Sequence, residues 1–242
     1  MPLLPIKRTA GRNGVEVFSA DRARPVVSPE IQRVINARSG NAGVSGPYNG
    51  MTWGPPVKYV EIPGGEAGTR ATLKIMKELV LSPWGHRNPE VVWLAKKIVK
   101  DVSPGPKKNY RAMVGKILEF MKTEVKYELD PSGLEYVQTP HYTLLTEGSG
   151  DCDDAATSAA ALGMALGFKA GFRTVRGDPS RPDQWSHVYA VIGIPVKGKV
   201  KWLTVDSTQP ESHLDWDPPE AAQLGMKTWV IDPSLEKTSW HT

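Results

Sequence analysis

The chain lacks several features that would narrow its function at once. It has only one cysteine, Cys152, so it cannot form an internal disulfide, and its fold does not depend on an oxidising compartment. Its 30 basic and 26 acidic residues leave a net charge of +4, and its lysine pairs do not extend into a long basic stripe. We therefore predict neither a disulfide scaffold nor a nucleic-acid partner.

Long apolar runs are also missing. The longest, residues 188–196, is far shorter than the roughly 20 residues that a membrane-spanning helix requires. The first residues contain no apolar stretch typical of a signal peptide. We expect no membrane span, and the length of 242 residues suits one sizeable core with an appended segment.

Residues 1–68 differ in composition from the rest of the chain. Glycine and proline fill 18 of these 68 positions, against 26 of the remaining 174. Such a density of helix and strand breakers predicts a largely extended arm over residues 1–68, followed by a folded domain over residues 69–242. Aromatic residues in the arm indicate that part of it docks, either on its own domain or on neighbouring subunits.

The domain is predicted to have an α+β fold. Apolar residues at helical spacing predict helices from residue 69, from Asn88 and over about 107–123, and a helix of unusually small residues over 151–166. Strands are predicted at 125–129, 170–175, 187–194, 200–206 and 228–231. Helices followed by strands favour a central helix packed on an antiparallel sheet.

The lone thiol lies at the predicted start of the small-residue helix, within residues 148–154. A helix start lowers the pKa of a cysteine thiol, and its outward-facing N–H groups are natural oxyanion donors. Asp151, Asp153 and Asp154 oppose the thiolate by their negative charge. We therefore expect these acids to point elsewhere, as helix caps or toward a cation or an arginine.

Register brings a histidine and an aspartate together. An even turn centred on Lys197 and Gly198 pairs residues whose numbers sum to 395, which makes His187 and Asp206 diagonal neighbours on one face of the sheet. Each residue alone has a structural interpretation: an inert buried thiol, a hydrogen-bonded histidine and a turn-capping aspartate. In combination they favour a nucleophile, a base and an orienting carboxylate. Metal binding by the three aspartates together with His187 is a weaker alternative.

The box Gly150-Asp151-Cys152-Asp153-Asp154, with the segments 185–189 and 202–208, resembles the transglutaminase-like superfamily, and the upstream residues 137–145 resemble its branch in tailed bacteriophages and prophages. The resemblance implies a papain-like fold with a Cys-His-Asp triad. Cys152 is then the nucleophile, His187 the general base and acid, and Asp206 the orienting carboxylate. Gln138 is a candidate oxyanion donor by its chemistry, although its spacing from Cys152 is not that of papain's glutamine. Trp185 is a candidate substrate-binding residue.

The resemblance implies acyl transfer to an amine or hydrolysis, on a peptide bond or a glutamine amide, through a thioester. The expected substrate is a protein or peptide, no cofactor or metal is expected, and the expected location is the cytoplasm of a bacterial host or the phage virion. The alternative is a structural virion or assembly protein, a head-tail or tail component that uses the fold with vestigial or no catalysis. It would contact other virion subunits through residues 1–68, and the aromatics Trp216, Trp229 and Trp240 are expected to be exposed.

Overall fold

The computed structural model describes residues 57–59, 65–102, 109–130 and 136–233. Most of the predicted arm, and with it any contact to other subunits, lies outside these residues. Strand β1 (Val57–Tyr59) pairs antiparallel with β3 (Tyr136–Gln138), so this part of the arm docks on its own domain. Helix α2 (Gly65–Leu81) begins four residues before the predicted boundary. In the described part of the chain no helix is long and apolar enough to cross a membrane.

The three predicted helices before the thiol are present as α2, α3 (Pro89–Ile98) and α4 (Tyr110–Glu124). Asparagine side chains cap the last two: Asn88 accepts hydrogen bonds from the backbone N–H groups of Glu90 and Val91, and Asn109 accepts one from Ala112. Such caps satisfy backbone donors that a helix leaves without partners at its start. Each helix turns an apolar stripe into one common core.

Four antiparallel strands form the main sheet, in the order β7-β6-β5-β8. They span β5 (Lys169–Val175), β6 (His187–Val196), β7 (Lys199–Val205) and β8 (Met226–Ile231). Lys197 and Gly198 have positive φ values of 49° and 77°, as a two-residue hairpin turn requires. Ala190 pairs with Val205, so the predicted register is confirmed. The mixture of helices and an antiparallel sheet confirms the predicted α+β class.

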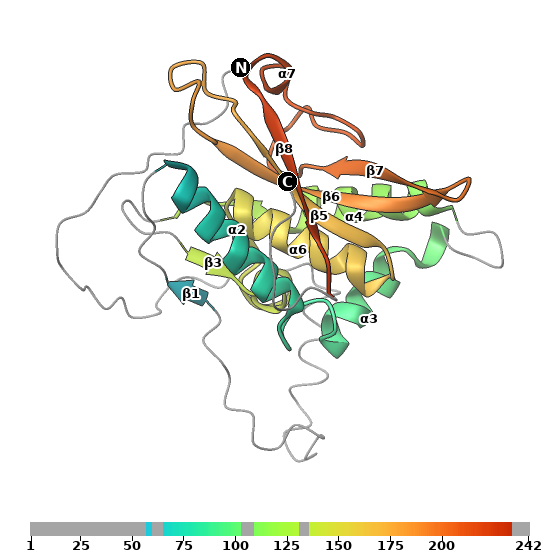
Figure 1. Cartoon of the computed structure of the whole chain (residues 1–242). Helices are drawn as coiled ribbons and strands as arrows, with labels where there is room; N and C mark the ends of the chain where they lie inside the picture. The colour runs from blue at the N-terminus through green and yellow to red at the C-terminus, as the bar shows by residue number, and fades with distance from the viewer. Residues whose placement is uncertain (1–56, 60–64, 103–108, 131–135, 234–242) are drawn as a thin grey trace.

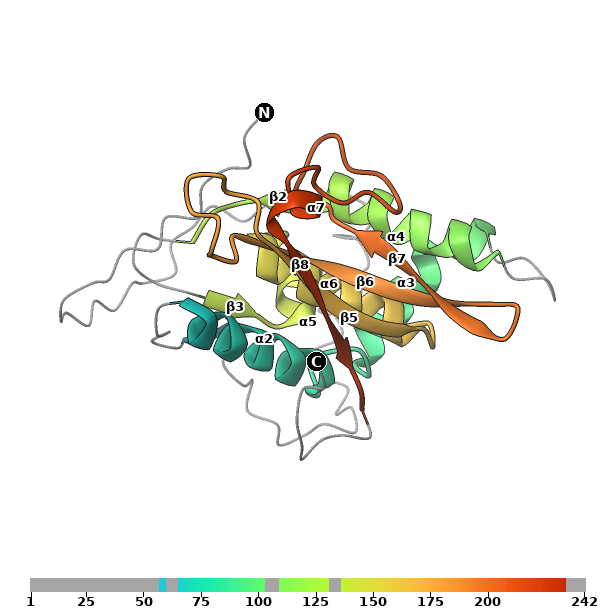
Figure 2. The same ribbon diagram turned by 45° about the horizontal axis from the view of Figure 1, so that its top comes forward.

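Helix α6 (Cys152–Ala165) lies at the centre of the molecule, between the sheet and the other helices (Figures 1 and 2). Its residues 152–163 are all buried, and most have small side chains. At Gly163 a β-carbon would lie only 2.9 Å from Cδ1 of Ile192 in β6, which shows how closely the helix approaches the sheet. Small residues are required here because larger ones would push the sheet away.

Short elements surround the start of α6, and of these only a strand at 125–129 was predicted. The predicted strand at 125–129 is reduced to β2 (Lys126–Tyr127), which pairs in parallel with β4 (Ser149–Gly150). The short helix α5 (Pro140–Tyr142) continues into the π-helical turn η2 (Thr143–Glu147), which ends at Gly148 with a φ of 70°. The remaining short elements are η1 (Lys100–Val102) and α7 (Ala221–Leu224).

The aromatic residues near the end of the chain correct one expectation. Trp229 was expected to be exposed, but only 1% of it is accessible to solvent, because its position in β8 turns it into the core. Its indole N–H donates to Oγ1 of Thr174 at 3.1 Å. Trp216 is half-buried, and Trp240 lies outside the described residues. The alternative of a structural virion protein therefore loses Trp229 as a docking residue.

Stability should depend strongly on the packing of α6. Leu162→Ala removes a fully buried side chain, so we expect the free energy of unfolding to fall by about 2–5 kcal/mol. Leu129→Ala is the matched control, because Leu129 is 53% exposed and its truncation should cost less than about 0.5 kcal/mol. Urea unfolding followed by circular dichroism measures both. Equal losses would contradict the central position of α6.

Candidate functional site

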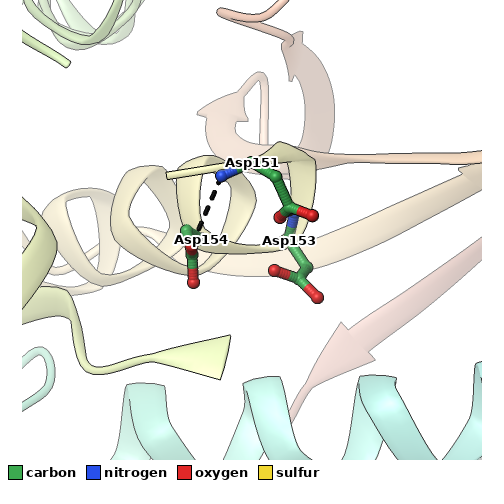
Figure 3. A group of neighbouring side chains, drawn as sticks. All are labelled: Asp151, Asp153 and Asp154. Atoms are coloured by element: carbon green, nitrogen blue, oxygen red, sulfur yellow. Dashed lines mark hydrogen bonds between the residues drawn. The ribbon is translucent and has the colours of Figure 1, made fainter. Parts of the chain in front are cut away.

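The start of α6 is fixed by its own aspartates. Asp151 is the N-cap, and its Oδ1 accepts a hydrogen bond from the backbone N–H of Asp153 at 3.0 Å. Oδ2 of Asp154 accepts in return from the backbone N–H of Asp151 at 3.3 Å (Figure 3). At Gly150 a β-carbon would lie 2.5 Å from that same Oδ2. The glycine of the Gly-Asp-Cys box is therefore required by the capping arrangement.

Asp154 lies apart from the other two carboxylates in Figure 3. Its Oδ1 accepts a hydrogen bond from the backbone N–H of Gln138 at 2.7 Å. Burial and the charge of Asp151 raise the pKa of Asp154 well above its usual range, against the opposing effect of the two N–H donors. A raised pKa reduces the negative charge beside Cys152. The expectation that these acids act as caps is confirmed for Asp151 and Asp154.

Cys152 is the first residue of α6 and is 6% exposed. It borders a cavity of about 40 Å³, room for a few water molecules. The walls come from α2, the start of α6, and the neighbouring parts of β5 and β6: Thr69, Thr72, Leu73, Met76, Asp151, Cys152, Asp153, Thr174, Trp185, Ser186, His187 and Val188. Cys152 and His187 thus share one cavity, although 34 residues separate them in the sequence.

His187 and Asp206 are paired as the register predicted. Nε2 of His187 lies 2.8 Å from Oδ2 of Asp206, and both residues are buried. Oδ1 of the same carboxylate accepts from the backbone N–H of Thr208 at 3.0 Å and from its hydroxyl at 2.8 Å. The hydroxyl of Ser212 donates to the backbone carbonyl of Asp206. These contacts fix the carboxylate and engage Nε2, so Nδ1 is the imidazole nitrogen that remains for chemistry.

Opposing effects set the charge of Asp206. Burial raises the pKa of its carboxyl group, but the charge and hydrogen bond of His187 and the two hydrogen bonds of Thr208 outweigh burial. The pKa of Asp206 is therefore below its ordinary value, and the group is a carboxylate at neutral pH. A buried carboxylate in this position orients the ring and stabilises a positive charge on it.

The two other residues singled out by sequence occupy different surroundings. Trp185 borders the cavity, and its indole N–H donates to Oε2 of Glu66 in α2 at 3.1 Å. Gln138 is not among the residues that border the cavity. Its side-chain oxygen accepts from the hydroxyl of Thr143 at 3.0 Å, which orders the turn that leads toward Cys152. The structure thus brings Trp185, but not Gln138, to the cavity.

Sequence reasoning missed two contributors to this site. Helix α2 supplies one wall of the cavity, although its apolar positions indicate only a core helix. Tyr127 lies in β2 directly opposite Gly150. Burial raises the pKa of its phenol far above the ordinary value, and the negative charges of Asp151 and other nearby acids, and of Cys152 when it is a thiolate, add to this effect. No local signal marks either contributor, because both reach the site through contacts between distant segments.

Among the residues that the structure describes, the three aspartates beside the thiol form a group that could hold a metal ion. One carboxylate oxygen from each lies within 4.8 Å of the others, without a contribution from His187. Two of the three carboxylates already accept backbone hydrogen bonds in the capping arrangement. Metal binding by the three aspartates stays a prediction.

Comparison with protein families agrees with this geometry. The model of the transglutaminase-like superfamily matches residues 96–207, a range that includes Cys152, His187 and Asp206. Over these residues the chain resembles that superfamily. Helix α2 precedes the matched range, so one wall of the cavity lies outside the part that this family model covers. A comparison with curated proteins finds no significant match.

Several solved structures are similar to parts of this chain. Calcium-bound LapG of Legionella pneumophila is 19% identical with a TM-score of 0.39, over 66% of this chain and 84% of LapG. The periplasmic domain of TgpA from Pseudomonas aeruginosa is 22% identical with a TM-score of 0.37, over 51% of this chain and 46% of that domain. A candidate protease of Parabacteroides distasonis is 15% identical with a TM-score of 0.37, over 55% of this chain. The chain spans only 26% of that protein and less than half of the TgpA domain.

Stability should depend on pH through Asp206. Because its pKa is lower in the folded than in the unfolded protein, its charged form stabilises the fold above the unfolded pKa, and this contribution disappears as pH falls through the folded pKa. We expect the free energy of unfolding of the wild type, relative to Asp206→Asn, to decrease as pH falls from about 5 to about 2. Urea unfolding of both proteins at each pH measures this difference. A difference that grows with acidity would contradict the assigned direction.

Proposed function

We propose that this protein is a cysteine enzyme that cleaves an amide through a thioester, by hydrolysis or by acyl transfer to an amine. One observation carries the proposal: the imidazole of His187, tied through Nε2 to the buried carboxylate of Asp206, borders the same cavity as Cys152. A thiol, an imidazole and a carboxylate in this relation form a nucleophile, a base and an orienting group. The transglutaminase-like family match supports the same chemistry.

In the first half of the reaction, Nδ1 of His187 accepts the thiol proton and the sulfur of Cys152 attacks the amide carbonyl carbon. The resulting tetrahedral oxyanion lies at the positive end of α6, which favours negative charge. The carbon–nitrogen bond breaks as the imidazolium returns its proton to the departing amine. The acyl group then remains on sulfur as a thioester.

In the second half, water or an amine attacks the thioester while Nδ1 of His187 accepts a proton from the attacking group. The carbon–sulfur bond breaks and the thiol recovers its proton from the imidazolium. Throughout, Asp206 holds the ring by Nε2 and stabilises its positive form. The cavity of about 40 Å³ holds only a few water molecules, so substrate groups bound there displace most of the solvent near the sulfur.

The finer parts of the proposal rest on the sequence resemblance. They are the bacteriophage or prophage branch, a protein or peptide substrate, the oxyanion contribution of Gln138, and a location in the host cytoplasm or the virion. These stay predictions. For Gln138 to reach the oxyanion, its amide would have to leave the contact with Thr143.

Alkylation tests whether the thiol is activated. Because Cys152 is the only cysteine, alkylation that iodoacetamide adds to cysteine, located by peptide mapping, reports on this residue alone. At pH 6 we expect alkylation at least about tenfold faster than that of a model thiol, since the helix start and the imidazolium favour the thiolate. His187→Ala should remove most of this advantage.

His213→Ala is the matched control, since His213 is exposed and lies outside the cavity. It should leave the alkylation rate unchanged. A wild-type rate at pH 6 no greater than that of the model thiol, in folded protein, would contradict an activated nucleophile. An equal loss in both histidine variants would remove His187 from the proposed role.

The thioester itself can be observed with an activated ester. p-Nitrophenyl acetate should release a burst of p-nitrophenol equal to the enzyme concentration and leave one acetyl group on Cys152. Asp206→Asn should slow the burst by about a hundredfold or more, because the imidazolium loses its carboxylate partner. Stopped-flow absorbance and intact mass measure the burst and the adduct. Cys152→Ser is the control that should show no burst, and acetylation only at other residues would contradict the thioester.

A further inference from the structure

Arg176 is a half-buried cation at the end of β5. Its backbone N–H donates to the carbonyl of Gly225 at 3.0 Å. The Cδ atom of Arg176 lies 3.8 Å from the position a β-carbon would take at Gly225, which has a φ of 120°. The backbone of Arg176 and the start of its side chain are therefore packed against Gly225. Yet Nε of Arg176 is buried and has no hydrogen-bond partner in the described part of the chain.

Other arginines of the structure are satisfied in a different way. Within the described residues, four arginines form ion pairs with carboxylates: Arg70 with Glu66, Arg111 with Asp215, Arg173 with Asp217, and Arg181 with Asp178. Arg87 is exposed, so water can solvate it. A guanidinium with a buried N–H and no anion nearby is costly. Among the described arginines, Arg176 is thus the one to which a bound anion would supply a missing hydrogen-bond acceptor.

The position of Arg176 connects it to the thiol cavity. Its guanidinium carbon lies 4.7 Å from the centroid of the Trp185 ring. Trp185 borders the cavity together with Cys152 and His187, and its indole N–H is held by Glu66. The guanidinium therefore lies one side chain away from the cavity, beside the ring of Trp185.

We propose that Arg176 is a substrate-binding residue for a carboxylate located close to the amide that Cys152 attacks. This inference rests on the proposed function and names a substrate class for it: peptides or amides with a carboxylate near the cleaved bond. A guanidinium binds carboxylates through two parallel N–H donors, and Nε is one donor of such a pair. The carboxylate could be the C-terminus of a peptide or an acidic side chain.

The competing explanation is that stacking on Trp185 is the whole role of Arg176. Cation–π contacts of this kind stabilise folded proteins without any ligand. Stacking uses the face of the guanidinium, however, and does not supply Nε with a hydrogen-bond partner. The two explanations predict different alkylation rates at Cys152 when a neutral reagent is replaced by a negatively charged one of the same size.

Charged and neutral alkylating reagents of equal size make that comparison. N-iodoacetylglycine carries a carboxylate, and N-iodoacetylglycinamide is its neutral analogue; each attaches to the sulfur with loss of iodide. In the wild-type protein we measure the ratio of the two alkylation rates at Cys152 by intact mass. Arg176→Gln should lower this ratio by at least about fivefold with little change in the neutral rate. Arg176→Lys, which keeps the charge but not the fork, should retain part of the ratio.

Arg181→Gln is the matched control, because it removes the same charge from a nearby arginine that is already paired with Asp178. It should leave the ratio unchanged. A ratio that stays the same in Arg176→Gln, or that falls equally in both glutamine variants, would overturn the proposal. If Cys152 shows no activation toward the neutral reagent in the wild type, the proposed function fails, whereas an activated thiol with an unchanged ratio removes only the carboxylate subsite.

The same assay can distinguish a carboxylate at a peptide C-terminus from one on an acidic side chain. Iodoacetyl-isoasparagine has an amidated α-carboxyl group and a β-carboxylate, so it presents a side-chain acid without a C-terminus. Dependence on Arg176 for N-iodoacetylglycine alone assigns the subsite to a peptide C-terminus. Dependence for iodoacetyl-isoasparagine alone assigns it to an acidic side chain. Dependence for neither reagent contradicts the subsite.

Discussion

The capping arrangement at the start of α6 is the constraint on which the rest of the site depends. Asp151 and Asp154 satisfy backbone donors at that start, and Asp154 also binds the backbone of Gln138 in β3. The same contacts engage two carboxylates in backbone hydrogen bonds and fix Cys152 at the first position of the helix. Without them the helix would fray, and the sulfur would lose its defined position relative to the cavity.

The sheet provides the second half of the site by a different physical route. The hairpin turn at Lys197 and Gly198 sets the register of β6 and β7, and this register places His187 beside Asp206. Helix and sheet then have to meet at the correct distance. The small residues of α6 allow this, since Gly163 lies almost in contact with Ile192. The site is thus assembled where a capped helix start meets the end of a hairpin.

The surroundings of the thiol extend beyond the residues that the family model matches. Helix α2 lies before the matched range, yet it supplies one wall of the cavity and, through Glu66, holds Trp185. The Trp185 ring also lies 4.7 Å from the guanidinium carbon of Arg176, whose buried Nε has no hydrogen-bond partner in the described structure. Groups near the thiol thus come both from α2, which lies outside the matched range, and from Trp185 and Arg176, which lie inside it.

The sequence by itself determined the local features of this protein. Breaker residues, helical periodicity and cap residues indicated the helices, and the turn at Lys197 and Gly198 was sufficient to predict that His187 pairs with Asp206, because register follows directly from turn geometry. Only the tertiary structure decided which distant segments meet at the thiol. The wall formed by α2, the position of Tyr127 opposite Gly150 and the isolation of Arg176 depend on packing between elements far apart in the chain. Such packing has no local pattern in the sequence, and it also buried Trp229, which its position near the end of the chain had suggested was exposed.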